Sequence, residues 1–114
     1  MNVEQLIDAA ARAAIEHDRL PDGAVELLTT IRPRADGLYN VPAAARHAYR
    51  SSVNDAAESS AGAFRWFNNL MVTITAERDA EAAGLSGPEI GIAGTRAVAA
   101  ARAKINAAIE RGEY

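Results

Sequence analysis

Three glycines near the C-terminal end of the chain have a spacing that suggests a phosphate-binding loop. Gly87, Gly91 and Gly94 lie four and three residues apart. A P-loop, however, follows a strand and ends in Gly-Lys-Ser/Thr, whose lysine reaches the phosphates. Here Thr-Arg follows Gly94 and no strand pattern precedes the run. The alternative is a helical face of small residues, continued by Ala101, against which another helix can pack closely.

The two histidines are the next candidates for chemistry. A metal site on a helix needs histidine or carboxylate partners three or four residues away. Around His47 those positions hold two alanines, an arginine and a serine. His17 has Glu16, Asp18 and Asp22 nearby, but it lies where a helix is expected to end, and a cation there complements the helix dipole. We therefore expect no metal ligand and no cofactor.

Catalytic constellations are also missing from the sequence. The chain has no cysteine, which excludes disulfides, thiolate metal sites and cysteine nucleophiles. Its serines lack the context of a nucleophile elbow. Glu77 and Glu81 lie one helical turn apart, so a shared acidic site is conceivable, but a solvated helix face is favoured. The sequence predicts a protein that is not an enzyme.

The most distinctive segment, 64–71, carries three of the six aromatic residues. At helical spacing one face collects the expected core residues Phe64, Phe67, Leu70 or Met71, and Ile74. Trp66 points about 100° away from that face. Tryptophan is enriched in binding hot spots, yet large aromatics also fill cores. Partner contact and internal filler both stay open for Trp66, with filler favoured.

A basic stripe forms the second candidate for a binding surface. Arg46, Arg50 and Arg65 could share it, with His47 and Tyr49 alongside. Arg46 and Arg50 are a like-charged pair one helical turn apart, which is mildly destabilising unless nearby acidic groups neutralise it. The predicted partner-binding residues are thus Trp66, Arg46, Arg50, Arg65 and Tyr49.

Helical periodicity runs through the whole chain, and no period-2 strand pattern occurs. The first helix is expected from Val3 to His17, with Asn2 and Gln5 as a capping box. A short helix from Ala24 to Ile31 follows. Proline at position 33 then makes 32–37 a loop.

A long helical segment, 41–83, occupies the middle of the chain. Asn40 can cap it, and Pro42 falls in its first turn. Its weak place is Ser-Ser-Ala-Gly at 59–62. A straight helix of this length would span about 60 Å, whereas a compact domain of about 100 residues has a radius of gyration of about 13 Å. Either one helix crosses 59–62 and the molecule is elongated or oligomeric, or the segment bends there, which we favour.

The last helix has clear boundaries. Gly84 is expected to end the preceding helix, and Ser86 with Glu89 forms a capping box for the next. That helix is expected to reach Arg111, and Gly112 closes it. Its apolar face comprises Ile90, Ala97, Val98, Ala101, Ile105, Ala108 and Ile109.

Composition limits what such a chain can do. About a quarter of the 114 residues are alanine, which predicts a thin core and closely packed helices. The 15 acidic residues outnumber the 12 basic ones, which argues against a nucleic-acid surface. We find no signal peptide and no apolar run long enough to span a membrane, so we expect a cytoplasmic protein of a bacterial cell or phage host.

The sequence therefore predicts an all-α fold: one helical domain, 1–114, built as a compact or slightly elongated bundle of four to five helices. The expected function is a non-enzymatic protein–protein interaction module. A phage-encoded accessory factor, such as an inhibitor of a host system, would act in this way by presenting a helical surface to another protein or to its own copies. The alternatives are a self-associating virion or assembly component and a helical nucleic-acid-binding regulator.

Overall fold

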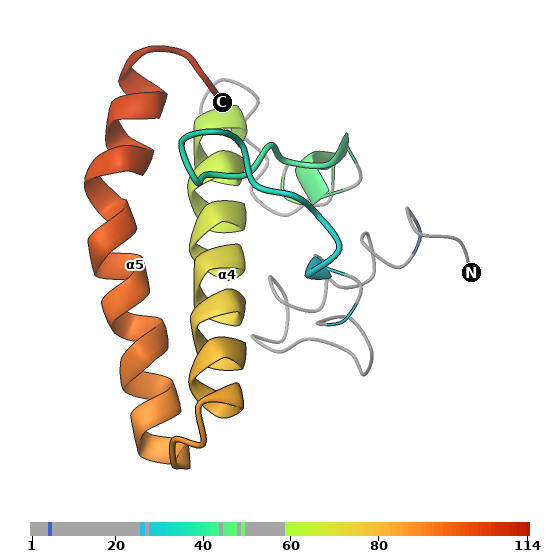
Figure 1. Ribbon diagram of the computed structural model, residues 1–114. Helices are drawn as coiled ribbons and strands as arrows, with labels where there is room; N and C mark the ends of the chain where they lie inside the picture. Colours follow the sequence, from blue (N-terminus) through green and yellow to red (C-terminus); the bar gives the residue numbers. More distant parts are fainter. Residues whose placement is uncertain (1–4, 6–25, 27, 44, 48, 50–58) are drawn as a thin grey trace.

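Two long antiparallel helices form the frame of the structure, a computed structural model (Figure 1). Helix α4 comprises Ser59–Ala82 and helix α5 comprises Gly87–Glu110. The structure describes residues 28–43, 45–47, 49 and 59–114, together with Gln5 and Glu26. This part of the chain is helical and contains no strand, as predicted. The helix expected at Val3 to His17 lies outside the described residues.

The connection between the helices is built as the sequence predicts. Gly84 adopts a positive φ of 83°. Its N–H donates to the carbonyl oxygen of Glu81 at 3.0 Å, and the N–H of Leu85 donates to that of Ala80 at 3.1 Å. These two bonds form a Schellman motif, which satisfies the last carbonyl groups of α4. Gly112, with a φ of 72°, closes α5 in the same way.

The start of α5 differs from the expected capping box. Ser86 is the N-cap residue and Pro88 lies in the first turn, as predicted. The hydroxyl of Ser86, however, makes no bond to a backbone N–H and instead lies 3.1 Å from Oε1 of Glu89. The helix ends at Glu110, so that Arg111 is its C-cap. The two predicted side chains meet each other rather than the backbone.

A further helical stretch precedes α4 and includes Ala43, residues 45–47 and Tyr49. The rings of Tyr49 and Trp66 lie 6.0 Å apart between centroids. One straight helix through both residues would separate them by about 25 Å along its axis. The segment 41–83 is therefore not a single straight helix, and α4 begins at Ser59, where the weak place was expected.

The second predicted helix ends earlier than expected. Glu26 and Leu28 are helical, but Thr29 and Thr30 form a turn, so the helix does not reach Ile31. The radius of gyration is 13.9 Å, close to the value of about 13 Å for a compact domain of 100 residues. The described residues thus show three helical stretches besides this helix end, and the total of four to five helices stays a prediction.

Two groups of buried side chains hold the described part together, and α4 contributes residues to both. The first group contains Leu28, Tyr39, Ala45, Phe67, Met71 and Ile74. The second group lies against α5 and contains Leu38, Phe64, Ile105 and Ala108. The expected core face of α4 is confirmed, and it serves both groups. Leu38 and Tyr39 can enter different groups because successive side chains of an extended backbone point in opposite directions.

The segment 31–42, which is extended at Leu38 and Tyr39, is held to α4 by one buried side-chain amide. Asn68 is fully buried. Its Oδ1 accepts from the N–H of Tyr39 at 2.7 Å, and its Nδ2 donates to the carbonyl oxygens of Tyr39 at 3.0 Å and Phe64 at 2.9 Å. The side chain therefore pairs with an extended residue as a neighbouring strand would. This bond pattern places Leu38 and Tyr39 in their respective core groups.

A second set of contacts, made by Arg34, joins the same segment to the C-terminal residues. Arg34 and Asp36 form an ion pair with Nη2 and Oδ2 2.6 Å apart. The other Nη of Arg34 donates to the backbone carbonyl of Glu113 at 2.7 Å, and its guanidinium lies 5.5 Å from the ring centroid of Phe64. Because the hydrogen bonds from Arg34 favour the charged carboxylate, they lower the pKa of Asp36. Arg34 thus links the loop, α4 and the C-terminal residues.

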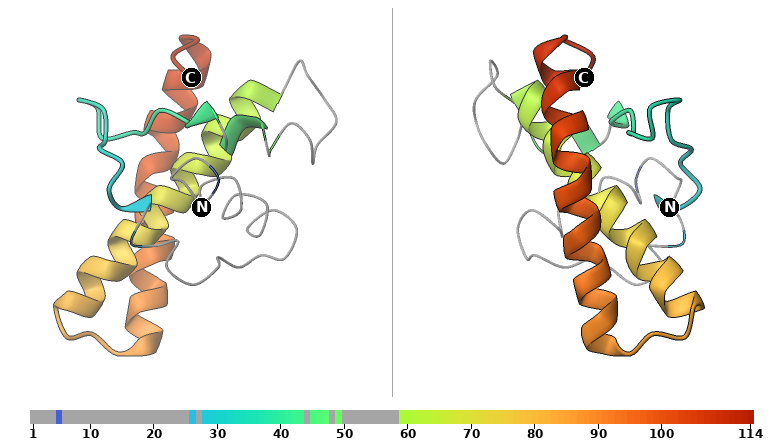
Figure 2. Two further views of the ribbon diagram at one scale, coloured as in Figure 1. Left: turned by 90° about the vertical axis from the view of Figure 1, so that its right-hand side faces the viewer. Right: turned by 60° about the vertical axis from the view of Figure 1, so that its left-hand side comes forward.

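Figure 2 shows how these parts are arranged in space. Helices α4 and α5 cross each other and separate toward their ends, while the segment 29–42 lies over one side of α4. The opposite side of α5 is left uncovered by the described residues (Figures 1 and 2). No helix among the described residues is long and apolar enough to cross a membrane.

Candidate functional site

The predicted aromatic residues lie together at the N-terminal end of α4. The indole of Trp66 is half-buried, stacks on Tyr49 with ring planes 29° apart, and also meets Phe67 at a tilted angle. Tyr49 covers Gly62, where an added Cβ would lie 2.6 Å from the phenolic oxygen. Trp66 also packs against the first core group. It fills space between α4 and the preceding helical stretch, and a role in partner contact stays a prediction.

The predicted basic stripe stays a prediction, because only part of it lies among the described residues. Arg46 is half-buried, and Arg50 lies outside the described residues. Arg65 is exposed and turns toward α5, where its Nη2 donates to Oδ1 of Asn106 at 3.0 Å. Tyr49 instead lies over Gly62 and Trp66, which occupy another face of α4. Arg65 therefore belongs to the surface between α4 and α5.

Of the three glycines in the predicted small-residue face, only Gly94 lies close to α4. Gly94 is buried, and a Cβ there would lie 3.0 Å from Oε1 of Glu77 and 3.2 Å from Cγ2 of Thr73 on α4. At Gly87 and Gly91 an added Cβ would meet no described atom within 4 Å. Ala101 packs against the second core group. The two helices cross, so the face separates from α4 toward its glycine-rich end.

The acidic and histidine candidates do not assemble into a site. Glu77 is half-buried over Gly94, whereas Glu81 is exposed. His47 is exposed, and His17 lies outside the described residues. Within the described ranges no three histidine or carboxylate side chains come close enough to hold a metal ion.

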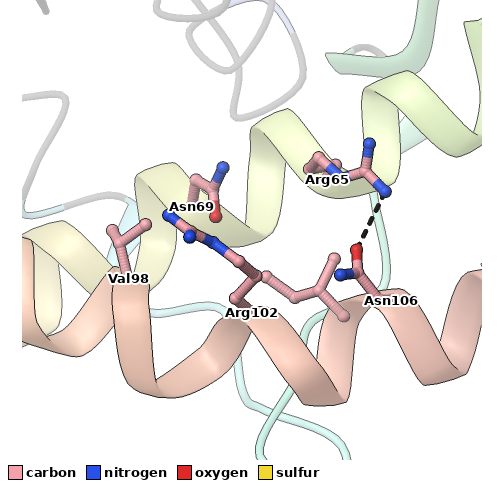
Figure 3. Close-up of a pocket in the computed structure, with 6 residues that line it drawn as sticks. Arg65, Asn69, Val98, Arg102 and Asn106 are labelled. Carbon is pink, nitrogen blue, oxygen red and sulfur yellow. Dashed lines mark hydrogen bonds between the residues drawn. The ribbon is translucent and has the colours of Figure 1, made fainter.

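Sequence analysis missed a polar cleft between α4 and α5. Its volume is about 360 Å³, and its lining residues are Arg65, Asn69, Val98, Arg102, Ile105 and Asn106. Figure 3 shows Arg65 and Asn69 projecting from α4, with Arg102 and Asn106 projecting from α5. A signal was present in the sequence, since each Arg–Asn pair has the four-residue spacing that puts both side chains on one helical face.

A second missed feature is a set of exposed apolar residues on the outer face of α5, which also carries the exposed Arg96. Ile92, Ala99 and Ala103 are all exposed, and Ile92 has 51% of its surface accessible. Their spacing of seven and four residues places them on one helical face. That face lies about 160° around the helix from Gly94, which contacts α4. The outer stripe (Ile92, Ala99 and Ala103) thus lies mainly on the outer side of α5, although Ala99 also borders a hollow that Thr73 and Glu77 of α4 line.

In comparisons with known proteins, no family model, no curated protein and no solved structure matches the chain.

Proposed function

We propose that this chain is a protein–protein interaction module that binds a partner through the outer stripe of α5. The observation that carries the proposal is the exposure of Ile92, 51%, on a helix whose other isoleucines and single valine are buried or half-buried. A surface helix of a monomer ordinarily presents charged and polar side chains on its outer face. Alanine alone is common on exposed helices because of its helix propensity. Isoleucine gains no such advantage, so Ile92 is the residue on which the proposed surface depends.

The chemistry of the stripe favours a helical partner. Alanines at positions 99 and 103 give α5 a low profile, which lets a second helix approach, and Ile92 supplies a side chain that such a helix can bury. Burying an isoleucine in this way contributes about 1.5–3 kcal/mol. The partner is either another protein or a second copy of the chain. In the accessory role predicted from the sequence, it would be a component of the host.

The first experiment measures solution mass by light scattering over a concentration series, together with affinity capture using the whole chain as bait. We then compare Ile92→Glu with the parent chain. A buried glutamate removes apolar contact and requires the desolvation of a charge, so we expect loss of association or capture. Leu85→Glu is the matched control, because Leu85 is also an exposed aliphatic residue, 41% accessible, in the connection between α4 and α5.

The outcomes test the proposed surface and the proposed interaction function separately. Loss with Ile92→Glu and retention with Leu85→Glu support the outer stripe. Retention with both variants would show that the stripe is not the surface. A chain that remains monomeric and captures no protein would contradict the interaction function itself. Trp66→Ala is a weaker test of partner contact, because it also removes packing against Tyr49.

A further inference from the structure

The cleft between α4 and α5 combines two positive charges with an absence of acidic lining. Arg65 and Arg102 enter it from opposite helices, and Asn69 and Asn106 complete its polar wall (Figure 3). None of its lining residues is a carboxylate. The nearest acidic residue in the adjoining hollow is Glu77, which shares that hollow with Arg102 but forms no ion pair with it. Two guanidinium groups therefore face one cleft without a neutralising charge among the described residues.

The hydrogen-bond donors of this cleft are largely unused. Arg65 donates one bond, to Oδ1 of Asn106, and that bond orients the Asn106 amide. Among the described residues, the side chains of Asn69 and Arg102 make no hydrogen bond, and Nδ2 of Asn106 donates none. A guanidinium offers five N–H donors in a planar fork, and each carboxamide offers two. The cleft is thus rich in donors and poor in acceptors.

The floor of the cleft increases the effect of these donors. Val98 is half-buried and Ile105 is 1% exposed, and both line the cleft from α5. An apolar floor excludes water from one side of a bound group, and charge-assisted hydrogen bonds are stronger where water is excluded. The ligand that fits is consequently one with several acceptor atoms and a negative charge.

We propose that the cleft formed by Arg65, Asn69, Arg102 and Asn106 binds an oxyanion, a phosphate or a carboxylate group. Arginine matches both through two parallel N–H···O bonds. A cation would be repelled by the two guanidinium groups, and a neutral polar group would leave both positive charges without a counter-charge. This inference does not rest on the proposed partner surface, because none of the outer-stripe residues lines the cleft.

The test uses the whole chain, labelled with nitrogen-15, and NMR titration at constant ionic strength. The probes are sodium phosphate and sodium acetate, with sodium chloride as the control for screening. We expect saturable shifts of the side-chain amide signals of Asn69 and Asn106 with an oxyanion and none with chloride. Because both arginines are exposed, the affinity is expected to be weak, and chemical shifts detect weak binding.

Arg102→Gln tests the assignment, since it removes one charge while keeping a long polar side chain. Affinity is expected to fall about tenfold or more, the effect of losing a hydrogen bond to a charged group. Arg32→Gln is the matched control: it makes the same charge change at an exposed residue of the connecting segment that does not line the cleft. An equal loss in both variants would mean general charge screening and would overturn the proposal.

A third arm identifies the source of the oxyanion. A short blocked peptide containing one glutamate is compared with the same peptide containing glutamine. Saturation by phosphate assigns a free anion to the cleft, and saturation only by the glutamate peptide assigns a carboxylate carried on another chain. Both results support an oxyanion site. Shifts that stay linear with every probe, or that match those of chloride, refute it.

Discussion

Replacing Asn68 by alanine tests the account of how the extended segment is held to α4. The asparagine side chain makes three hydrogen bonds, of which two go to the backbone N–H and C=O of Tyr39. Alanine removes all three. The Phe64 carbonyl keeps its place in the helix, but both backbone groups of Tyr39 would lose their partner inside a buried region. The expected result is loss of the packing of Leu38 and Tyr39.

The magnitude follows from the two orphaned groups. Each buried donor or acceptor left unsatisfied costs about 1–3 kcal/mol. Removing part of a fully buried side chain adds a cavity term. We expect Asn68→Ala to lower the free energy of unfolding by about 3–5 kcal/mol, a large share of the 5–15 kcal/mol that is typical of domains.

Urea unfolding followed by circular dichroism measures this loss, and amide hydrogen exchange at Tyr39 localises it. Asn69→Ala is the matched control, because Asn69 is the next residue on α4 and its side chain makes no hydrogen bond within the described structure. Its effect is expected to stay within about 0.5 kcal/mol, as for surface positions generally. A loss below about 1 kcal/mol in Asn68→Ala would refute the reasoning, since a single unsatisfied buried group should already cost that much.

Two further predictions concern the glycine face and the loop ion pair. Gly91→Ala is expected to raise the free energy of unfolding by about 0.5–1 kcal/mol, because alanine has the higher helix propensity. Gly94→Ala is expected to raise it less or to lower it, because the added Cβ would lie 3.0 Å from Oε1 of Glu77. Equal gains of the two variants in urea unfolding would contradict the close approach of α4 at Gly94. The pKa of Asp36 is lowered in the fold by Arg34, so its contribution is present above its ordinary pKa of 3.8 and is lost as the pH falls through the lowered value. The stability difference between the parent chain and Asp36→Asn should therefore shrink on acidification, and a difference that does not change with pH would show that the ion pair contributes nothing.

The elements with local signals were predictable from the sequence. The C-terminal helix, its closing glycine and the connection at Gly84 agree with the structure because a helix end depends on backbone geometry that few residues favour. The core face of α4 also follows from spacing alone, since residues three and four apart share a side. The capping box predicted at Ser86 does not form, because the Ser86 hydroxyl bonds to the carboxylate of Glu89 and not to a backbone N–H.

The candidate sites were less accessible to sequence reasoning. The basic stripe was placed on one long segment, and the close contact of Tyr49 with Trp66 shows that this segment is not one straight helix. The cleft needs residues from α4 and α5 at once, and their pairing depends on where the helices cross. Asn68 could not be selected over Asn69 from the sequence, because both are polar residues next to the apolar face.

The sequence by itself determined the helical class, the C-terminal end of α4, the ends of α5 and the apolar face of each helix, because these depend on periodicity and on glycine, proline and capping residues that act within a few positions. Only the tertiary structure decided what those faces meet. It buries Gly94 but leaves Gly91 open, pairs the amide of Asn68 with Tyr39, and brings Arg65 and Arg102 to one cleft. The physical reason is that such contacts join residues far apart in the chain, and their distances are fixed by the crossing of helices and by the packing of the whole core.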